Sequence, residues 1–272
     1  MKLKELPFSL IKTLKLVSIP VSKIKNAQSE KIPVIVSLTT IPSRMDKVHI
    51  TLRSILTQTK RPEKLLLWIN EKDQHNIPNS IQSLVGDILE LHFTPHTSSH
   101  KKLIPTLLLY PDRVIVTCDD DLIYESTWLE KLYQSHLKYP KDIICNKIRQ
   151  IAFDEHNNLQ DYKKWVFKNP NDPIKNMAIG AGGILYPPKS LHELITNYEL
   201  ALQLAPKNDD LWFKAMAVLN NTTVRQADDV TTEFLPIYGT QKISLKKINV
   251  DQNFNVNQWQ DLTNYFQLKI NN

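Results

Sequence analysis

The sequence predicts an α/β fold with a central, mostly parallel β-sheet flanked by helices. Short apolar runs rich in β-branched residues alternate along the chain with segments whose apolar residues recur at helical spacing. Such alternation is typical of parallel sheets whose strands are connected by helices. The chain has 272 residues, of which 42% are hydrophobic, so it can bury a substantial core without disulfides.

The expected elements follow one another along most of the chain. Residues 113–118 (RVIVTC) form the clearest strand, and residues 102–110 form a helix in which Pro105 falls within the first turn. The other expected strands are residues 33–39, 64–69, 88–93, 142–148, 184–186 and 222–227. The other expected helices are residues 46–58, 126–138, 211–218 and 257–268, with a loop leading into a short helix at 70–82.

The positive charge is concentrated at the N-terminus. The formal net charge is +6, and residues 1–31 hold seven lysines and two glutamates, so the rest of the chain is close to neutral. Nucleic-acid-binding proteins usually spread basic residues over the folded surface, so we expect no nucleic-acid partner. We expect a basic amphipathic segment at residues 1–31 and one domain at residues 32–272.

The basic segment can be interpreted in two ways. Leu10, Leu14 and Val17 could form one stripe of a short helix after Pro7, and residues 1–25 could then bind an anionic membrane surface. Equally, the stripe could pack on the domain, as most amphipathic helices do, or the segment could be a frayed leader. No apolar run reaches the length of a membrane span, and no secretion signal is recognisable.

The two cysteines, Cys118 and Cys145, lie in apolar runs, which suits a reducing compartment better than a disulfide framework. The protein is therefore expected in the cytoplasm, either free or peripherally bound to the inner face of the cytoplasmic membrane.

Three consecutive acids follow the clearest strand. Asp119, Asp120 and Asp121 lie where ligands bind in parallel sheets, beyond the carboxyl ends of the strands. Carboxylates about 4 Å apart near a protein surface repel by about 4 kcal/mol, which a divalent cation would offset. In extended chain, Asp119 and Asp121 would point together towards the metal, while Asp120 would point away. The alternative is a helix cap followed by solvated acids, which explains one aspartate better than three.

Several segments resemble, in order, motifs of bacterial glycosyltransferases with the GT-A fold. VSLTTIPSR at 36–44 and the later RPEKLLLWIN resemble the opening of these enzymes, and VTCDDDLIY resembles their Asp-x-Asp signature. Further segments of such sugar transferases are resembled by three more stretches of the chain: SSHKKLIPTLLLYPD, IGAGGILYPP and NDDLWFKAMAV. The resemblance covers roughly residues 33–220 and implies a single GT-A-like, Rossmann-like domain.

The resemblance implies roles for particular residues. Asp119 and Asp121 would hold Mn²⁺ or Mg²⁺, with Asp119 also near the ribose, and Lys101 or Lys102 would face the diphosphate of a nucleotide-sugar. The remaining residues expected in the nucleotide pocket are Thr39, Thr40, Arg44, Asn70 and Asp120. Arg44 and the two lysines could equally be solvated surface charges.

Two further positions are candidates on the acceptor side. The chain has only five glycines, and Gly180, Gly182 and Gly183 lie close together, which favours a surface where a ligand approaches the main chain, or else a tight turn. Asp209 and Asp210 begin a segment of helical spacing; either could act as the base that deprotonates an acceptor, or both could simply favour the helix N-terminus.

These inferences give one leading hypothesis and two alternatives. The first is metal-dependent transfer of a sugar from a nucleoside diphosphate sugar, such as a UDP-sugar, to a glycan or glycolipid hydroxyl, with inversion if an aspartate is the base. The second keeps the fold but makes the protein a metal-dependent nucleotidyltransferase or phosphohydrolase. The third is a glycan-binding protein without catalysis. His92, His96 and His100 recur every four residues, but Pro95 interrupts them, so we do not expect a metal there.

Overall fold

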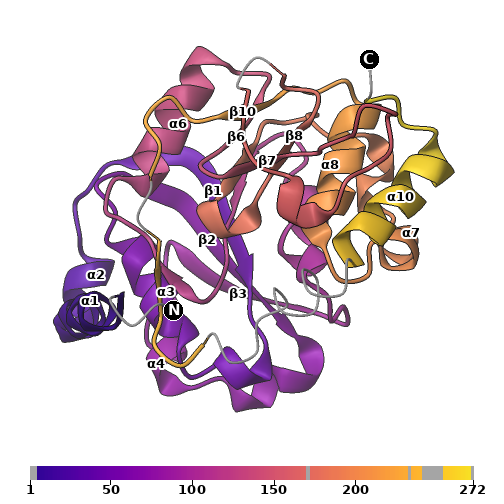
Figure 1. Cartoon of the computed structure of the whole chain (residues 1–272). Coiled ribbons are helices and arrows are strands. Elements are labelled where there is room, and N and C mark those ends of the chain that lie inside the picture. Colours follow the sequence, from indigo (N-terminus) through magenta and orange to yellow (C-terminus); the bar gives the residue numbers. More distant parts are fainter. Residues whose placement is uncertain (1–4, 170–171, 232–233, 241–253, 271–272) are drawn as a thin grey trace.

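A computed structural model describes residues 5–169, 172–231, 234–240 and 254–270 (Figure 1). Its main sheet has seven strands in the order β10-β6-β9-β4-β1-β2-β3. The strands are β1 (Lys31–Thr39), β2 (Arg61–Asn70), β3 (Leu89–Thr94), β4 (Val114–Thr117), β6 (Ile143–Cys145), β9 (Ile184–Tyr186) and β10 (Val224–Gln226). The pairs β1–β2, β1–β4, β2–β3 and β6–β10 are parallel, whereas β9 is antiparallel to both β4 and β6. The predicted α/β class with a mostly parallel sheet is therefore confirmed.

Helices cover both faces of the sheet because consecutive strand residues point to opposite sides. In β1, Val34, Val36 and Leu38 belong to one core, whereas Ile35 belongs to another cluster on the other face. The helices that belong to the first core are α3 (Val48–Leu56), α4 (Asn79–Gln82) and α6 (Trp128–Lys138). The helices of the core on the opposite face of the sheet are α5 (Ile104–Leu109), α7 (Tyr198–Leu204), α8 (Asp209–Leu219) and α10 (Phe254–Phe266).

Short elements complete the architecture. Two small antiparallel sheets pair β5 (Leu122–Ile123) with β11 (Leu235–Pro236) and β7 (Ile148–Gln150) with β8 (Asn176–Ala178). The 3₁₀ helices are η2 (Pro42–Arg44), η3 (Glu71–Asn76), η4 (Ser99–Lys102), η5 (Tyr162–Lys164), η6 (Gly180–Gly182) and η7 (Glu193–Thr196). The N-terminal helices are α1 (Leu6–Ser18) and α2 (Val21–Lys25).

One expected strand is corrected. The run 142–148 was expected to be a single strand, but β6 ends at Cys145 and Ile148 begins β7 in a separate sheet. The side chain of Asn146, between the two strands, donates to Gly182 O (3.0 Å) and accepts from Thr231 N (2.9 Å). These bonds hold the chain where it leaves the main sheet.

Within the basic N-terminal segment, α1 and α2 are helical, and α1 packs on the domain. Arg53 of α3 donates from Nη1 to Leu16 O (3.0 Å) and Ile19 O (2.8 Å), and Ser9 Oγ donates to Pro236 O (2.7 Å). Figure 1 places α1 and α2 at one edge of the molecule, on the opposite side from α10. In the described part of the chain, no helix has the length and apolar character required to cross a bilayer.

Candidate functional site

The acids singled out in the sequence lie at the carboxyl edge of the sheet and near one another. Asp119, Asp120 and Asp121 follow β4, which is the neighbour of β1 in the centre of the sheet. Asp209 and Asp210 begin α8, and the lysine-containing η4 brings Lys102 between the two groups. The site is therefore assembled from segments that lie up to about a hundred residues apart in the sequence.

Arg44 neutralises two of the three consecutive acids. Its Nη1 lies 2.6 Å from Asp120 Oδ1 and its Nη2 lies 3.0 Å from Asp121 Oδ2. Thr40 Oγ1 also donates to Asp120 Oδ2 (2.7 Å). Burial raises the pKa of Asp120, and Arg44 and the Thr40 hydroxyl oppose that rise.

The orientation expected for these acids is corrected. Asp119 and Asp121 were expected to point together, with Asp120 turned away, as in an extended strand. Instead Asp120 and Asp121 share Arg44, whereas Asp119 faces Lys102. The reason is that β4 ends at Thr117 and the chain turns at residues 120–121 before β5, so the two-residue alternation of a strand no longer applies.

Lys102 is the central cation of the site. Its Nζ lies 3.1 Å from Asp119 Oδ1 and 3.0 Å from Asp209 Oδ2, and only 4% of the residue is exposed. Burial alone would lower the pKa of Lys102, but Asp119, Asp209 and Asp210 together raise it well above its usual value. Lys102 therefore stays charged, and it links the end of β4 to the start of α8.

Asp209 and Asp210 differ in their protonation behaviour. Burial tends to raise the pKa of Asp209, but Lys102, His100 and a bond from Ser99 Oγ (2.7 Å) lower it overall. Burial, with the neighbouring Asp209 charge, raises the pKa of Asp210 to about 7. Gly180 N donates to Asp210 Oδ2 (3.0 Å) and Oδ1 (3.2 Å). One of this pair is thus ionised, and the other exchanges its proton near neutral pH.

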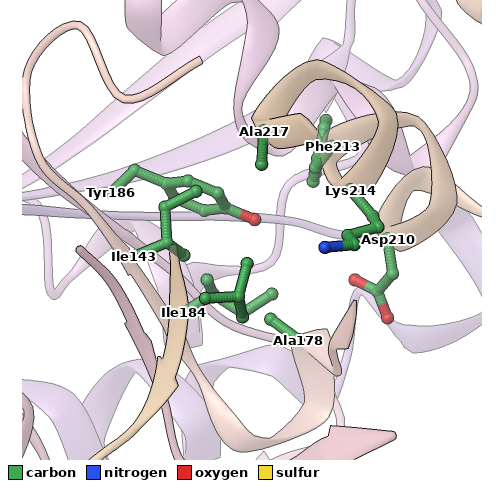
Figure 2. A pocket seen from close by; sticks show the side chains of 9 residues that line it. Ile143, Ala178, Ile184, Tyr186, Asp210, Phe213, Lys214 and Ala217 are labelled. Carbon is green, nitrogen blue, oxygen red and sulfur yellow. The ribbon is translucent and has the colours of Figure 1, made fainter. Parts of the chain in front are cut away.

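A small apolar cavity beside Asp210 explains its desolvation. Figure 2 shows the Asp210 carboxylate at its margin, with the Tyr186 hydroxyl and the Lys214 ammonium pointing into it. The cavity has a volume of about 10 Å³, no larger than a single water needs. Lys214 Nζ donates to Ile174 O (2.6 Å), and burial lowers the pKa of Lys214 to about 7.

Of the three clustered glycines, Gly180 is the one beside the charged groups. A Cβ there would lie 3.0 Å from Asp210 Oδ1, 3.0 Å from Lys102 Nζ and 3.6 Å from Asp119 Oδ1. Gly180 is therefore the member of the predicted glycine cluster that lies closest to the charged side chains of the site.

Gly182 and Gly183, which were expected to face a ligand, pack against Trp128 instead. Trp128 Nε1 donates to Gly182 O (2.9 Å), and a Cβ on Gly183, whose φ is +86°, would lie 2.5 Å from Trp128 Cζ2. A Cβ on Gly182 would lie 3.0 Å from Lys147 Cγ. The tight-turn alternative therefore describes these two glycines better, because Trp128 and Lys147 fill the space that a ligand would need.

The other expected nucleotide-pocket residues lie at the same edge of the sheet, but several have structural partners. Thr39 Oγ1 donates to Trp68 O (2.9 Å), and Lys101 Nζ donates to Thr40 O (3.3 Å). Asn70 Nδ2 donates to Pro95 O (3.0 Å) and His96 O (3.1 Å), while its Oδ1 accepts from Lys72 N (3.0 Å). Asn70 therefore organises two loops, and its place in a nucleotide pocket stays a prediction.

Ser99, His100 and Tyr124 support the site, although the sequence did not identify any of them as a site residue. Ser99 orients Asp209, as described above, and His100 Nδ1 lies 2.9 Å from Ser98 Oγ. Burial lowers the pKa of His100 to about 4, so the ring is neutral at physiological pH. Tyr124 Oη accepts from Asp119 N (2.9 Å). Nothing in the local sequence pattern distinguishes these three polar residues from loop residues.

The donor set fits a divalent cation in chemistry, though not as a preformed cage. Carboxylate oxygens are the ligands that Mg²⁺ and Mn²⁺ prefer, and the Asp119 side chain, 33% exposed, is open to solvent. Among the described ranges, no three metal-ligating side chains converge on one point. Arg44 and Lys102 are paired with four carboxylates, so these ion pairs retain an excess of negative charge when all are ionised.

Comparison with known proteins gives likenesses in structure alone. No protein-family model matches the chain, and no curated protein matches it. Similar solved structures include 4-diphosphocytidyl-2C-methyl-D-erythritol synthase from Anaerococcus prevotii, with a TM-score of 0.47 and 14% identity over 85% of this chain and 98% of that one.

Two others are CMP:2-keto-3-deoxy-manno-octonic acid synthetase in complex with CTP and HddC from Yersinia pseudotuberculosis in complex with GMP-PN. Both have a TM-score of 0.43. The synthetase is 10% identical, and the match covers 75% of this chain and 91% of that one. HddC is 15% identical, and the match covers 84% of this chain and 100% of that one.

This comparison corrects the leading functional hypothesis. The three neighbours are named as a synthase, a synthetase and HddC, and none of the three is named as a glycosyltransferase. The hypothesis of sugar transfer from a nucleotide-sugar to a glycan or glycolipid is therefore withdrawn. At these identities the likeness concerns the fold, so residue roles rest on the geometry of the site.

Proposed function

We propose that this chain is a metal-dependent nucleotidyltransferase that binds a nucleoside triphosphate at the carboxyl edge of its sheet. The observation that carries the proposal is the alternation of cations and carboxylates around Lys102. Lys102 and Arg44 are held by Asp119, Asp209, Asp120 and Asp121 at contacts between 2.6 and 3.1 Å. Cations fixed in this way need little reorganisation to meet a polyphosphate.

The acids have a second role in this proposal. Asp119, whose side chain is open to solvent, would be a ligand of a divalent cation, which would neutralise negative charge on the polyphosphate and on departing pyrophosphate. Lys102 already contacts Asp119, so its ammonium lies beside the place where this cation would bind. Gly180 lacks the Cβ that would crowd Lys102 and Asp210, so both side chains can approach the main chain closely at this point.

Asp210 is the proposed proton acceptor. In nucleotidyl transfer, an acceptor oxygen bonds to the α-phosphorus while the bond from that phosphorus to the bridging oxygen breaks, and pyrophosphate leaves with the electron pair. If the acceptor is a hydroxyl, its proton must go to a base. A carboxylate whose pKa is about 7 is well matched to that task at neutral pH. Asp209, kept ionised by Lys102, would maintain that raised pKa.

The test is nucleotide binding by the full chain, followed by turnover. We expect one nucleoside triphosphate to raise the melting temperature with Mg²⁺ or Mn²⁺ present, and EDTA to abolish most of that rise. Lys102→Met should weaken the binding roughly ten- to hundredfold, the range for a lost charged hydrogen bond. Because Lys102 is buried and its replacement could disturb folding, Asp119→Asn at the exposed side of the site provides a second variant. The control is Lys60→Met, which removes an exposed pair with Glu30.

Pyrophosphate release from the bound triphosphate, in the presence of candidate acceptors, then tests the reaction. Binding that responds equally to Lys60→Met and Lys102→Met would contradict the placement of the site. Turnover of a nucleoside diphosphate sugar with no response to any triphosphate would contradict nucleotidyl transfer itself.

A further inference from the structure

The outer side of α1 is an exposed apolar surface. The fractional exposures of its large apolar residues are 64% for Phe8, 42% for Leu10, 51% for Ile11, 69% for Leu14 and 44% for Val17. These five residues, which we call the α1 face, lie on one side of the helix because positions three and four apart are neighbours. A surface helix normally turns such a stripe towards the core, so this arrangement is reversed.

The α1 face points outward because the other side of the helix is attached to the domain. Ser9 is fully buried and donates to Pro236 O, and Arg53 binds the last turn through Leu16 O and Ile19 O. Leu16 also packs against a small cluster that contains Ile50, Ile123 and Ile237. The helix is thus held in a defined orientation, and the apolar face is not hidden by the domain.

Exposed lysines lie on α1 and on the next helix along the chain. Lys15 of α1 is exposed, as are Lys23 and Lys25 of the adjoining α2. A second copy of the chain would bring the same lysines close to one another, whereas anionic lipid headgroups would neutralise them. Apolar side chains flanked by lysines on a short helix are also the pattern of helices that lie in a membrane interface.

We propose that the α1 face, with Lys15, Lys23 and Lys25, docks the protein on an anionic lipid bilayer. The apolar residues would enter the boundary between headgroups and acyl chains, and the lysines would contact the negative surface. The inference is independent of the reaction proposed above, because it concerns binding to lipid alone.

Co-sedimentation of the full chain with vesicles tests the proposal. We expect binding to phosphatidylcholine vesicles containing phosphatidylserine, and weaker binding to phosphatidylcholine alone. Each lysine near an anionic surface contributes about fivefold to binding, so the double variant Lys15→Gln/Lys23→Gln should bind about 25-fold more weakly. Leu14→Ser should weaken it at least about tenfold, because a leucine side chain leaves the apolar phase. Matched controls on other surfaces are Lys163→Gln and Leu137→Ser, both at exposed positions.

The outcomes are decisive because all of the altered side chains are exposed and the variants should fold, as circular dichroism can check. Selective loss of binding in the α1 and α2 variants supports the proposal. Equal effects in the control variants, or no binding to anionic vesicles, overturn it. Concentration-dependent dimerisation that Leu14→Ser abolishes, without vesicle binding, would assign the α1 face to a second copy of the chain instead.

Discussion

Four of the five acids at the carboxyl edge have a cation of the protein within 3.1 Å. Arg44 forms ion pairs with Asp120 and Asp121, and Lys102 forms ion pairs with Asp119 and Asp209. The crowding of negative charge that first suggested a metal is thus relieved in large part by the protein itself. Asp210 is the exception, since it is held by the Gly180 main chain and has the raised pKa.

Replacing Asp210 should change how stability depends on pH. Its pKa rises from 3.8 unfolded to about 7 folded, so the folded state binds more protons between these values and is favoured at low pH. The wild type therefore loses this contribution as pH rises through 7. Asp210→Asn cannot ionise. Its unfolding free energy relative to wild type should therefore increase by about 1–2 kcal/mol from pH 5 to pH 8, allowing for partial solvation and Lys102.

Urea denaturation at pH 5 and pH 8 measures this difference. Asp87→Asn, an exposed position, is the control and should follow the wild type at both values. If the unfolding free energies of wild type and Asp210→Asn changed by the same amount between pH 5 and pH 8, Asp210 would ionise normally in the folded protein.

The segment that carries Lys102 owes its position to a buried hydrogen-bond network. Pro105 lies at the start of α5, which runs from Ile104 to Leu109, and the residues before it form the 3₁₀ turn η4. Ser37 Oγ of β1 donates to Lys102 O (2.5 Å) and lies 2.8 Å from Thr106 Oγ1. Trp68 Nε1 of β2 donates to that same hydroxyl (2.8 Å). Two central strands thus fix the main chain of Lys102.

Thr106→Val should weaken this connection while it keeps the shape of the side chain. The indole N–H of Trp68 would lose its acceptor in a buried site, which costs about 1–3 kcal/mol of unfolding free energy. Thermal or urea denaturation measures the loss. Leu108→Ala, at a position 64% exposed on the same helix, should change stability by less than about 0.5 kcal/mol. A Thr106→Val protein as stable as the wild type would mean that water or another group replaces the hydroxyl.

The molecule combines a two-faced α/β layer with an attached N-terminal helix. The two main clusters of buried residues lie on opposite faces of the sheet, one with α3 and α6 and the other with α7, α8 and α10. The α1 helix belongs to neither main core and is attached through Arg53, Ser9 and the small cluster around Ile50. Its attachment should therefore be separable from the stability of the sheet.

Arg53→Met should release α1 without unfolding the sheet. The change removes the donor to Leu16 O and Ile19 O, while a methionine can still occupy the apolar part of the space. We expect faster hydrogen exchange and faster proteolysis within residues 6–25, with protection of β1 and β2 retained. Arg113→Met removes an exposed pair with Glu63 and serves as the control. Equal loss of protection in β1 would show that the helix is part of the main cooperative unit.

The sequence by itself determined the elements and the general place of the site. Apolar periodicity is local, so the strands around residues 33–39, 64–69 and 113–118 and the helix around 126–138 could be predicted within a few residues. The acids after residue 118 were correctly placed at the carboxyl edge, because residues that follow a strand must lie at its carboxyl end.

Only the tertiary structure decided which groups meet. Arg44 reaches Asp120 across 76 residues and Ser99 reaches Asp209 across 110, and no local pattern records such pairs. The reversed direction of β9, the contact of Gly183 with Trp128 and the outward apolar face of α1 likewise depend on how separate segments pack. A one-dimensional pattern specifies which side chains avoid water, whereas the partner of each charge is set when the whole sheet and its helices close around it.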